Sequence, residues 1–463
     1  MLWKRLGNKA TARSSQLTMR ERSSEPRSPR LRRRLRKACL VFAIIIAAYV
    51  LAGVVFRVLI WVELDRIKRE GDPVSLAQLA VMPPDSRNGA FAYEKAFAMM
   101  QNGKGRFSAL RDLNYESERA RNPRLWDQAR AELPRLAPIV AIADRAASMP
   151  TCKFGADWEK GYFPRNSDVC DLVRLLGGYA RLLAHSGRTD EAIRVLGLSV
   201  RVADALKPDC VAICYLVRGR MYRESSDIAC EIVAGSTVSE DDAKALADAL
   251  GRSGLGHQAL IVPKWERVIG CHDFDRAARQ GPPKDWFFGA GLAVSQFECS
   301  WIGRPILWAD ELFYLRAMRR AIRDADIPFR KLPKPPPLTV PCECQVRACV
   351  WPFSNARAID FDAYKQRRTA DTFQAKINGT RLALALRVYK QRFGEYPSRL
   401  SDLRKLGWKL DMTDPFTGRE FVHRQTAEGC LLYSVGANLK DECARQASET
   451  DPGDGDIVWK MRG

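Results

Sequence analysis

The hydrophobic pattern starts with one long apolar run. Residues 38–56 contain no charged side chain and are rich in Ile, Val, Leu and Ala. An α-helix rises about 1.5 Å per residue, so this run and residues 58–62 together can cross a hydrocarbon layer about 30 Å thick. Arg57 interrupts the run near its end, where its long side chain can reach water, and Trp61 suits the membrane interface. The pattern predicts a transmembrane helix over residues 38–62.

A cleaved signal peptide is the alternative interpretation of this run. The charged segment before it is too long for a signal peptide, the apolar run exceeds a usual signal core, and no clear cleavage site between small residues follows. Residues 51–53 are followed by Val54, where a lipoprotein would need Cys. We therefore expect an uncleaved anchor and a single-pass protein of the inner-membrane type.

The charges on either side of the run predict its orientation. Residues 1–37 carry thirteen Lys and Arg against two Glu, which is +11 of the net charge of +21, whereas the charges that directly follow the run cancel. The positive-inside rule then leaves this basic tail in the cytoplasm and the bulk of the chain outside. A nucleic-acid-binding arm is the competing interpretation. Because the tail adjoins the span, we expect contact with the lipid bilayer and no nucleic-acid partner.

Helical periodicity continues through residues 63–326, which we expect to form a helical extracytoplasmic domain. Ala90, Tyr93, Phe97 and Met100 recur at helical spacing and make one apolar face. This face predicts a helix whose one side packs into a core.

Residues 168–206 predict an antiparallel helix pair that reverses at Gly187, with Thr189 or Asp190 as the cap of the second helix. The turn resembles that of a tetratricopeptide-type repeat, but the sequence lacks three clean copies at a period of about 34 residues. Val238 is followed by a further helix start, in which Ser239 caps the helix and Asp242 occupies the capping-box position. We therefore expect helical hairpins rather than a regular repeat array.

Residues 327–365 are the predicted linker. Six prolines fall within residues 327–341, and proline lacks the N–H that helices and sheets need. The segment also holds the dense cluster Cys342, Cys344 and Cys349. The pattern predicts a boundary between the helical domain and a C-terminal module.

The thirteen cysteines indicate whether the compartment is oxidising. Cys39 lies inside the span, and twelve lie beyond it. Twelve cysteines in an oxidising space permit up to six disulfides, and the cluster in the linker matches no common zinc spacing. Buried free thiols are the alternative. Cys430 and Cys443 flank one short segment and are the pair that we most expect to bridge. The candidate disulfide cysteines are Cys342, Cys344, Cys349, Cys430 and Cys443.

Residues 366–463 predict a small α+β module. An amphipathic helix over residues 370–393 is followed by two short antiparallel strands, residues 419–423 and 431–433, and by a last apolar strand, residues 457–459. The fold class expected for the whole chain is therefore mainly α with this C-terminal α+β module, an N-terminal transmembrane helix and a helical-hairpin ectodomain.

This order of elements resembles the globular head of the major pseudopilin of the bacterial type II secretion system. The basic residues of helix 370–393 depart from that family, because a lipid-embedded assembly helix would bear about 2.5–3.5 kcal/mol for each central charge. A pilus subunit is therefore not expected. The region around residues 83–90 is similar to membrane-anchored bacterial proteins that end in such a module, and that likeness names no activity. The residues that carry the pseudopilin likeness are Tyr389, residues 394–397, Leu400, Leu403, Asp414, Pro415, Gly418, residues 433–436, Asp456 and Ile457.

The same resemblance implies a calcium ion in the late loop, and no other cofactor is expected. Calcium takes six to eight oxygen ligands, several of them anionic. Asn438 and Gly455 replace two of the acids that the family uses, which favours the alternative of a solvated acidic loop held by a Cys430–Cys443 bridge. The remaining candidate ligands are Asp441, Asp451, Asp454 and Asp456.

Familiar catalytic motifs are missing from the sequence. No nucleophile elbow, zinc-protease helix, Walker A loop or paired-glycine dinucleotide fingerprint occurs. Cys271 and His272 are neighbours, but adjacent residues on a helix point apart. We expect a non-catalytic structural or interaction protein with an envelope protein as partner, associated with envelope or secretion-type assemblies. The alternative is an envelope-anchored hydrolase with a site dispersed over residues 150–320.

Overall fold

The structure of the chain is a computed structural model in which 70% of the described residues are helical. A three-stranded antiparallel sheet lies near the C-terminus, so the expected fold class, mainly α with a small C-terminal α+β part, is confirmed. The chain divides into two compact units, Met1–Ala52 and Gly53–Gly463. The structure describes residues 29–101, 107–114, 122–156, 165–281, 292–333, 363–446 and 455–462.

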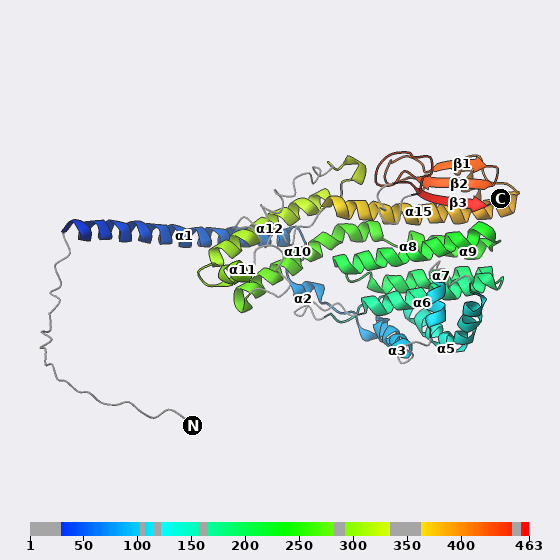
Figure 1. The fold of residues 1–463 in the computed structure, drawn as a ribbon, viewed down its shortest axis with the longest axis horizontal. Coiled ribbons are helices and arrows are strands. Elements are labelled where there is room, and N and C mark those ends of the chain that lie inside the picture. The colour runs from blue at the N-terminus through cyan, green and yellow to red at the C-terminus, as the bar shows by residue number, and fades with distance from the viewer. Residues whose placement is uncertain are drawn as a thin grey trace, which may run out of the picture. The chain divides into compact units, whose positions relative to one another are not determined.

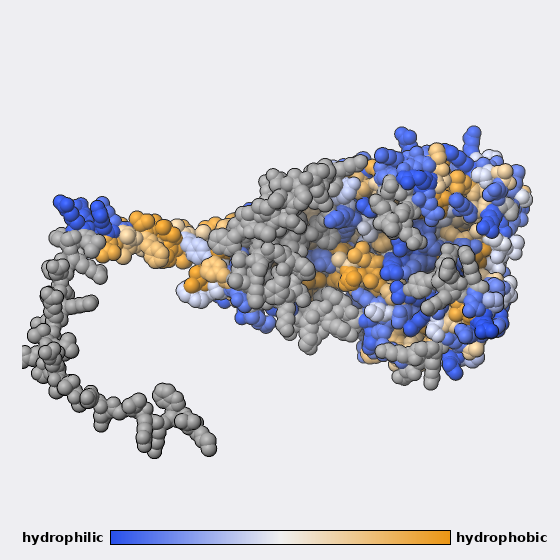
Figure 2. Space-filling view, viewed as in Figure 1, coloured by the Kyte–Doolittle hydropathy of each residue, from blue (hydrophilic) through white to orange (hydrophobic). Residues whose placement is uncertain are grey.

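The first unit holds most of one long helix, α1 (Pro29–Arg69), which begins in basic residues and continues into the apolar run. Figure 2 shows this change from hydrophilic to hydrophobic residues along the helix. Apolar side chains such as Leu40 and Ile45 are largely exposed. The helix is long and apolar enough to cross a membrane, and it is consistent with a membrane anchor or a signal sequence.

The second unit is built mostly from helices, which Figure 1 shows packed side by side. They are α2 (Leu76–Leu79), α3 (Ala90–Gln101), α4 (Ser108–Leu113), α5 (Pro123–Ala147), α6 (Asn166–His185), α7 (Thr189–Ala203), α8 (Ala212–Gly235), α9 (Glu240–Gly251), α10 (Leu255–Gln280), α11 (Leu292–Cys299), α12 (Arg304–Asp324) and α15 (Ala363–Phe393).

The antiparallel pair α6 and α7 confirms the hairpin that the sequence predicts. Gly187 takes φ of +74° at the reversal, a conformation that residues with a Cβ rarely adopt. Gly178 on α6 lies so close to α4 that an added Cβ would be 1.8 Å from the Leu110 carbonyl oxygen. The hairpin therefore depends on glycine at its turn and at its contact with α4.

Ser239 caps α9 as expected, because its hydroxyl accepts the Asp242 N–H at 3.1 Å. The capping box is not completed by Asp242. Instead, the Ser239 N–H donates to the Asp190 carboxylate at 2.7 Å. α7 itself begins at Thr189 without a side-chain cap. Asp190 therefore does not cap α7, and its carboxylate instead links the start of α7 to the start of α9.

The sheet consists of β1 (Val422–Thr426), β2 (Gly429–Ser434) and β3 (Ile457–Arg462), paired in that order. β1 starts three residues later than the sequence predicts, and a two-residue turn joins it to β2, because Thr426 pairs with Gly429. The sheet packs on α15, where the Trp459 ring lies against Gly379 and its Nε1–H donates to the Thr380 hydroxyl at 3.3 Å.

The helix α15 also packs against the helical part of the unit. Phe373 lies against Gly219 of α8, and Lys376 pairs with Asp227 at 2.5 Å. Buried residues of α15, the sheet and helices α3 to α10 form one continuous hydrophobic core. Residues 366–463 and the helical region therefore share a core, and α15 is the element that both use. Of the predicted linker, residues 334–362 lie outside the described residues.

Replacing Gly178 by Ala tests the close contact of α6 with α4. The new Cβ has no room beside the Leu110 carbonyl, so we expect a loss of about 2–3 kcal/mol in the free energy of unfolding. Gly197 on α7 is the matched control, because a Cβ there meets nothing within 4 Å, and Gly197→Ala should stabilise the helix by up to about 1 kcal/mol. Urea unfolding of both variants checks this, and equal effects would contradict it.

Candidate functional site

A groove of about 700 Å³ runs over the helical part of the second unit. α7 forms its floor with Val195 and Leu198, and α5 forms one wall with Leu133 and Val140. The opposite wall is α9, which contributes Ala245. α7 lies between the other two helices because its apolar stripe is wide enough to contact both. The floor and walls are therefore mainly apolar.

Charged side chains line the rim of this groove in pairs. Arg201 of α7 donates to Asp144 of α5 at 2.5 Å, and Arg194 of α7 donates to Asp242 of α9 at 3.0 Å. Each pair joins the floor helix to one wall. These exposed ion pairs contribute little to stability, about 0–1 kcal/mol each, but they surround the apolar groove with both signs of charge.

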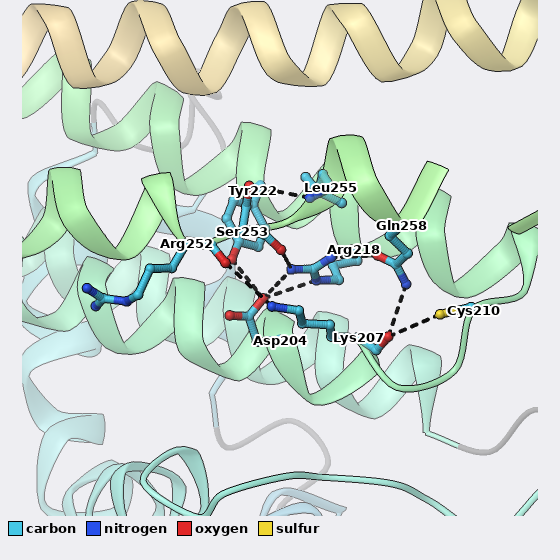
Figure 3. Close-up of polar contacts among 9 residues, drawn as sticks. All are labelled: Asp204, Lys207, Cys210, Arg218, Tyr222, Arg252, Ser253, Leu255 and Gln258. Carbon is cyan, nitrogen blue, oxygen red and sulfur yellow. Dashed lines mark hydrogen bonds and ion pairs between the residues drawn. The ribbon is translucent and has the colours of Figure 1, made fainter. Parts of the chain in front are cut away.

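A buried arginine joins the ends of several helices through polar contacts (Figure 3). Arg218 of α8 is 0% exposed. Its guanidinium donates to Asp204 at 2.6 Å and to Gln258 at 2.5 Å, and it also donates to the Ser253 carbonyl. Tyr222, one turn further along α8, donates its hydroxyl to Asp204 at 2.7 Å.

The partners of Arg218 come from the ends of different helices. Asp204 directly follows α7, Ser253 lies between α9 and α10, and Gln258 belongs to α10. Lys207 adds a contact to the Arg252 carbonyl at 3.5 Å. The network therefore sets the position of the floor helix α7 relative to the wall helix α9, and the groove between them depends on it.

Replacing Arg218 by Met tests this network. A buried charge pair that loses one partner costs about 3–5 kcal/mol, because the other charge is left without compensation. Asp204 is partly exposed, so we expect a loss near the lower end, about 3 kcal/mol. The double variant with Asp204→Asn should recover part of that loss. Chemical unfolding measures both, and a loss below about 1 kcal/mol for Arg218→Met would contradict the assignment.

A second buried polar cluster lies beside the network. Asp209 is buried, and its Oδ1 has no hydrogen-bond partner among the described residues. Desolvation raises the pKa of Asp209 to about 6, although the charge of Lys153 opposes the rise. Lys153 itself donates to the Leu79 and Val81 carbonyls at 2.5 and 2.9 Å. This lysine ties the segment after α2 to the helical core.

The raised pKa of Asp209 predicts a pH dependence of stability. Between pH values near 4 and 6 the folded state holds a proton that the unfolded state has lost, so the stability falls as the pH rises through this window. The Asp209→Asn variant should lack this fall. At pH 7.5 its free energy of unfolding should exceed that of the wild type by roughly 2–3 kcal/mol, at about 1.4 kcal/mol per pKa unit, and its unfolding temperature should be higher. Thermal unfolding from pH 4 to 8 checks this. Parallel profiles for the two proteins would contradict it.

The late loop brings together two of the four candidate calcium ligands. Asp441 accepts from the Tyr433 hydroxyl at 3.0 Å, and Asp456 accepts from the Ala444 N–H at 2.7 Å. Desolvation raises the pKa of Asp456, and the charge of Asp441 adds to the rise. Asp451 and Asp454 lie outside the described residues. Within the described chain, no three His, Cys, Asp or Glu side chains gather as metal ligands.

The disulfide expected between Cys430 and Cys443 is not formed, and both cysteines are free. Strand geometry explains the difference, because alternate residues of a strand face opposite sides of the sheet. Cys430 is buried and pairs with Met461 on the side that faces α15. Cys443 is exposed and lies in the loop near Tyr433, which faces the other side. Cys342, Cys344 and Cys349 lie outside the described residues.

The structure also places Cys271 and His272, the thiol and imidazole that are neighbours in the sequence. Cys271 and His272 are both on α10. Burial raises the pKa of Cys271, and the nearby Glu311 adds to the rise, which disfavours the thiolate that a nucleophile needs. The thiol packs among apolar residues between α1 and α12.

In comparisons with known proteins, no family model, no curated protein and no solved structure matches the chain.

Neither the groove nor the Arg218 network could be predicted from the sequence. A single arginine on an amphipathic helix is usually solvated. Arg218 is buried because the ends of several helices meet around it, and this contact between distant segments is visible only in the structure. The helical periodicity of α5, α7 and α9 could have indicated apolar faces, but not that these faces surround a groove.

Proposed function

We propose that the protein is a membrane-anchored extracytoplasmic docking protein, which holds a helical segment of an envelope partner in the groove between α5, α7 and α9. In this proposal α1 is an uncleaved anchor with its basic end in the cytoplasm. The partner belongs to an envelope or secretion-type assembly. The observation that carries the proposal is the groove, because it combines an apolar floor with a charged rim on an exposed face.

A small apolar cluster between α1 and α12 supports an uncleaved anchor. Ile60 and Ile67 of α1 are each 1% exposed and pack with Leu312 and Leu315 of α12. Glu63 of α1 also forms an ion pair with Arg319 of α12. Cleavage inside the apolar run would leave these contacts on a short N-terminal remnant of α1, whereas an uncleaved helix connects them directly to the lipid-spanning part.

The chemistry of the groove favours an amphipathic helix as its occupant. Such a helix lays its apolar face into a hydrophobic groove and leaves its polar face at the rim. Arg252 lies at one end of the groove, and no ion pair within the described chain engages its guanidinium. We therefore expect the bound helix to carry an acidic residue near that end, which can pair with Arg252.

Photo-crosslinking from the groove tests the docking proposal. A benzophenone amino acid at Ala141, an exposed groove position of α5, should crosslink an envelope protein in intact cells. Ala245→Glu on the opposite wall should reduce that crosslink at least tenfold, because a charge would enter the apolar groove. The crosslinked peptide should have the pattern of an amphipathic helix.

Ala98 provides the matched control, since it is an exposed alanine on α3, outside the groove. Ala98→Glu should leave the crosslink from Ala141 unchanged. Equal crosslinking in the Ala245→Glu variant and the wild type would contradict the groove as the docking surface. The same would follow if the probe gave the same crosslinks from Ala98 as from Ala141.

A further inference from the structure

The turn between α11 and α12 presents apolar side chains to the outside. Residues 299–303 contain no charged side chain. Trp301 is 79% exposed, Ile302 is 47% exposed, and Phe297 on the preceding helix is 44% exposed. Large apolar side chains gathered at one exposed site mark a binding surface more often than single ones do.

The backbone of this turn is held in place. The Ser300 hydroxyl donates to the Phe297 carbonyl at 2.5 Å and accepts from the Gly303 N–H at 3.2 Å. A Cβ at Gly303 would be 2.0 Å from the Phe297 carbonyl oxygen, so the turn depends on glycine. The structure therefore holds Trp301 and Ile302 outward on a defined turn.

The position of the turn follows from the contacts between α1 and α12. Gly53 meets Pro305 and Glu63 meets Arg319, so the two helices run parallel. The turn directly precedes Pro305. It therefore lies level with Gly53, or further from Glu63 along α1. Gly53 is four residues before Arg57. At about 1.5 Å per residue, it lies about 6 Å further into the apolar, N-terminal part of α1. Figure 1 shows α11 and α12 at the end of the second unit opposite the sheet.

Arg57, the charged residue of α1 closest to Gly53, has partners on α12. The Arg57 guanidinium lies 3.8 Å from the Glu311 carboxylate and 6.0 Å from the ring of Trp308. A charge near the hydrocarbon boundary is costly without such partners. On its outward side, α1 exposes Val54, Val58 and Trp61. Apolar side chains of α1 and of the turn thus occur at the same level of the molecule.

We infer that the turn between α11 and α12 inserts into the outer interfacial region of the lipid bilayer beside α1 and forms a second membrane contact. This inference rests on the proposed anchor. Ile60 already packs on α12, so we take the hydrocarbon boundary at Arg57 rather than at residue 62. Counted from Arg57, the depth of about 6 Å agrees with the roughly 5–10 Å at which interfacial segments bury their apolar face. Trp301 has the amphipathic indole that favours the membrane interface. Two contacts with the bilayer, rather than one flexible stalk, set the orientation of the helical body.

Quenching by brominated lipids tests the contact. The full-length protein is reconstituted into vesicles of phosphatidylcholine and phosphatidylglycerol whose acyl chains carry bromine close to the headgroup. Bromine quenches only nearby tryptophans, so Trp61, Trp301 and the half-buried Trp308, which lies beside Gly53 and Arg57, should account for most of the quenched emission. Trp301→Phe should then lower the quenched emission by about a third or more. Trp126→Phe is the control, because Trp126 stacks on His185 among the helices next to the groove, and it should leave the quenched emission unchanged.

Flotation of the same vesicles separates the two claims. If the protein floats with the vesicles and Trp301→Phe shows the wild-type amount of quenched emission, the second membrane contact is wrong and the anchor stands. Protein that does not float with the vesicles would overturn the anchor and this inference with it. Flotation together with the lowered quenched emission of Trp301→Phe would support both.

Discussion

The packing of the last turns of α1 onto α12 is the constraint that joins the long apolar helix to the second unit, and the proposed anchor depends on it. A single helix changes its surroundings along its length, from exposed apolar side chains before Gly53 to a buried face that includes Ile60 and Ile67. Gly53 allows this change because it lets Pro305 approach the helix backbone. The ion pair between Glu63 and Arg319 then fixes the register of the two helices. In the proposed function, this one helix is both the anchor and a part of the core.

The second organising element is α15, which serves the sheet on one side and the helical bundle on the other. Trp459 reaches α15 from β3, and Phe373 reaches α8 from α15. Its charged residues fit this position, because Lys376 pairs with Asp227 while its ammonium lies 5.1 Å from the ring of Trp459. The basic residues that exclude a lipid-embedded helix in the sequence are therefore used in protein contacts.

Local patterns in the sequence predict the helices and strands well. The apolar face of α3 and the hairpin α6–α7 follow from spacing and from glycine at the turn, since both depend on neighbours in sequence. Contacts between distant segments could not be predicted in this way. The burial of Ile60 is hidden in a run where nearly every residue is apolar, and Ile67 is a lone apolar residue among charged ones, so neither pattern indicates a contact with α12. Cys430 and Cys443 are close in sequence, yet strand alternation puts the sheet between them.

Peptide mapping of the mature protein is the most direct measurement of whether α1 is retained. Trypsin cuts after Lys37 and Arg57, so an uncleaved anchor yields the peptide of residues 38–57 from protein extracted from membranes. The proposed anchor predicts this peptide, and predicts that it is absent from the soluble fraction. A mature N-terminus inside residues 38–57, on protein found in the soluble fraction, would contradict it.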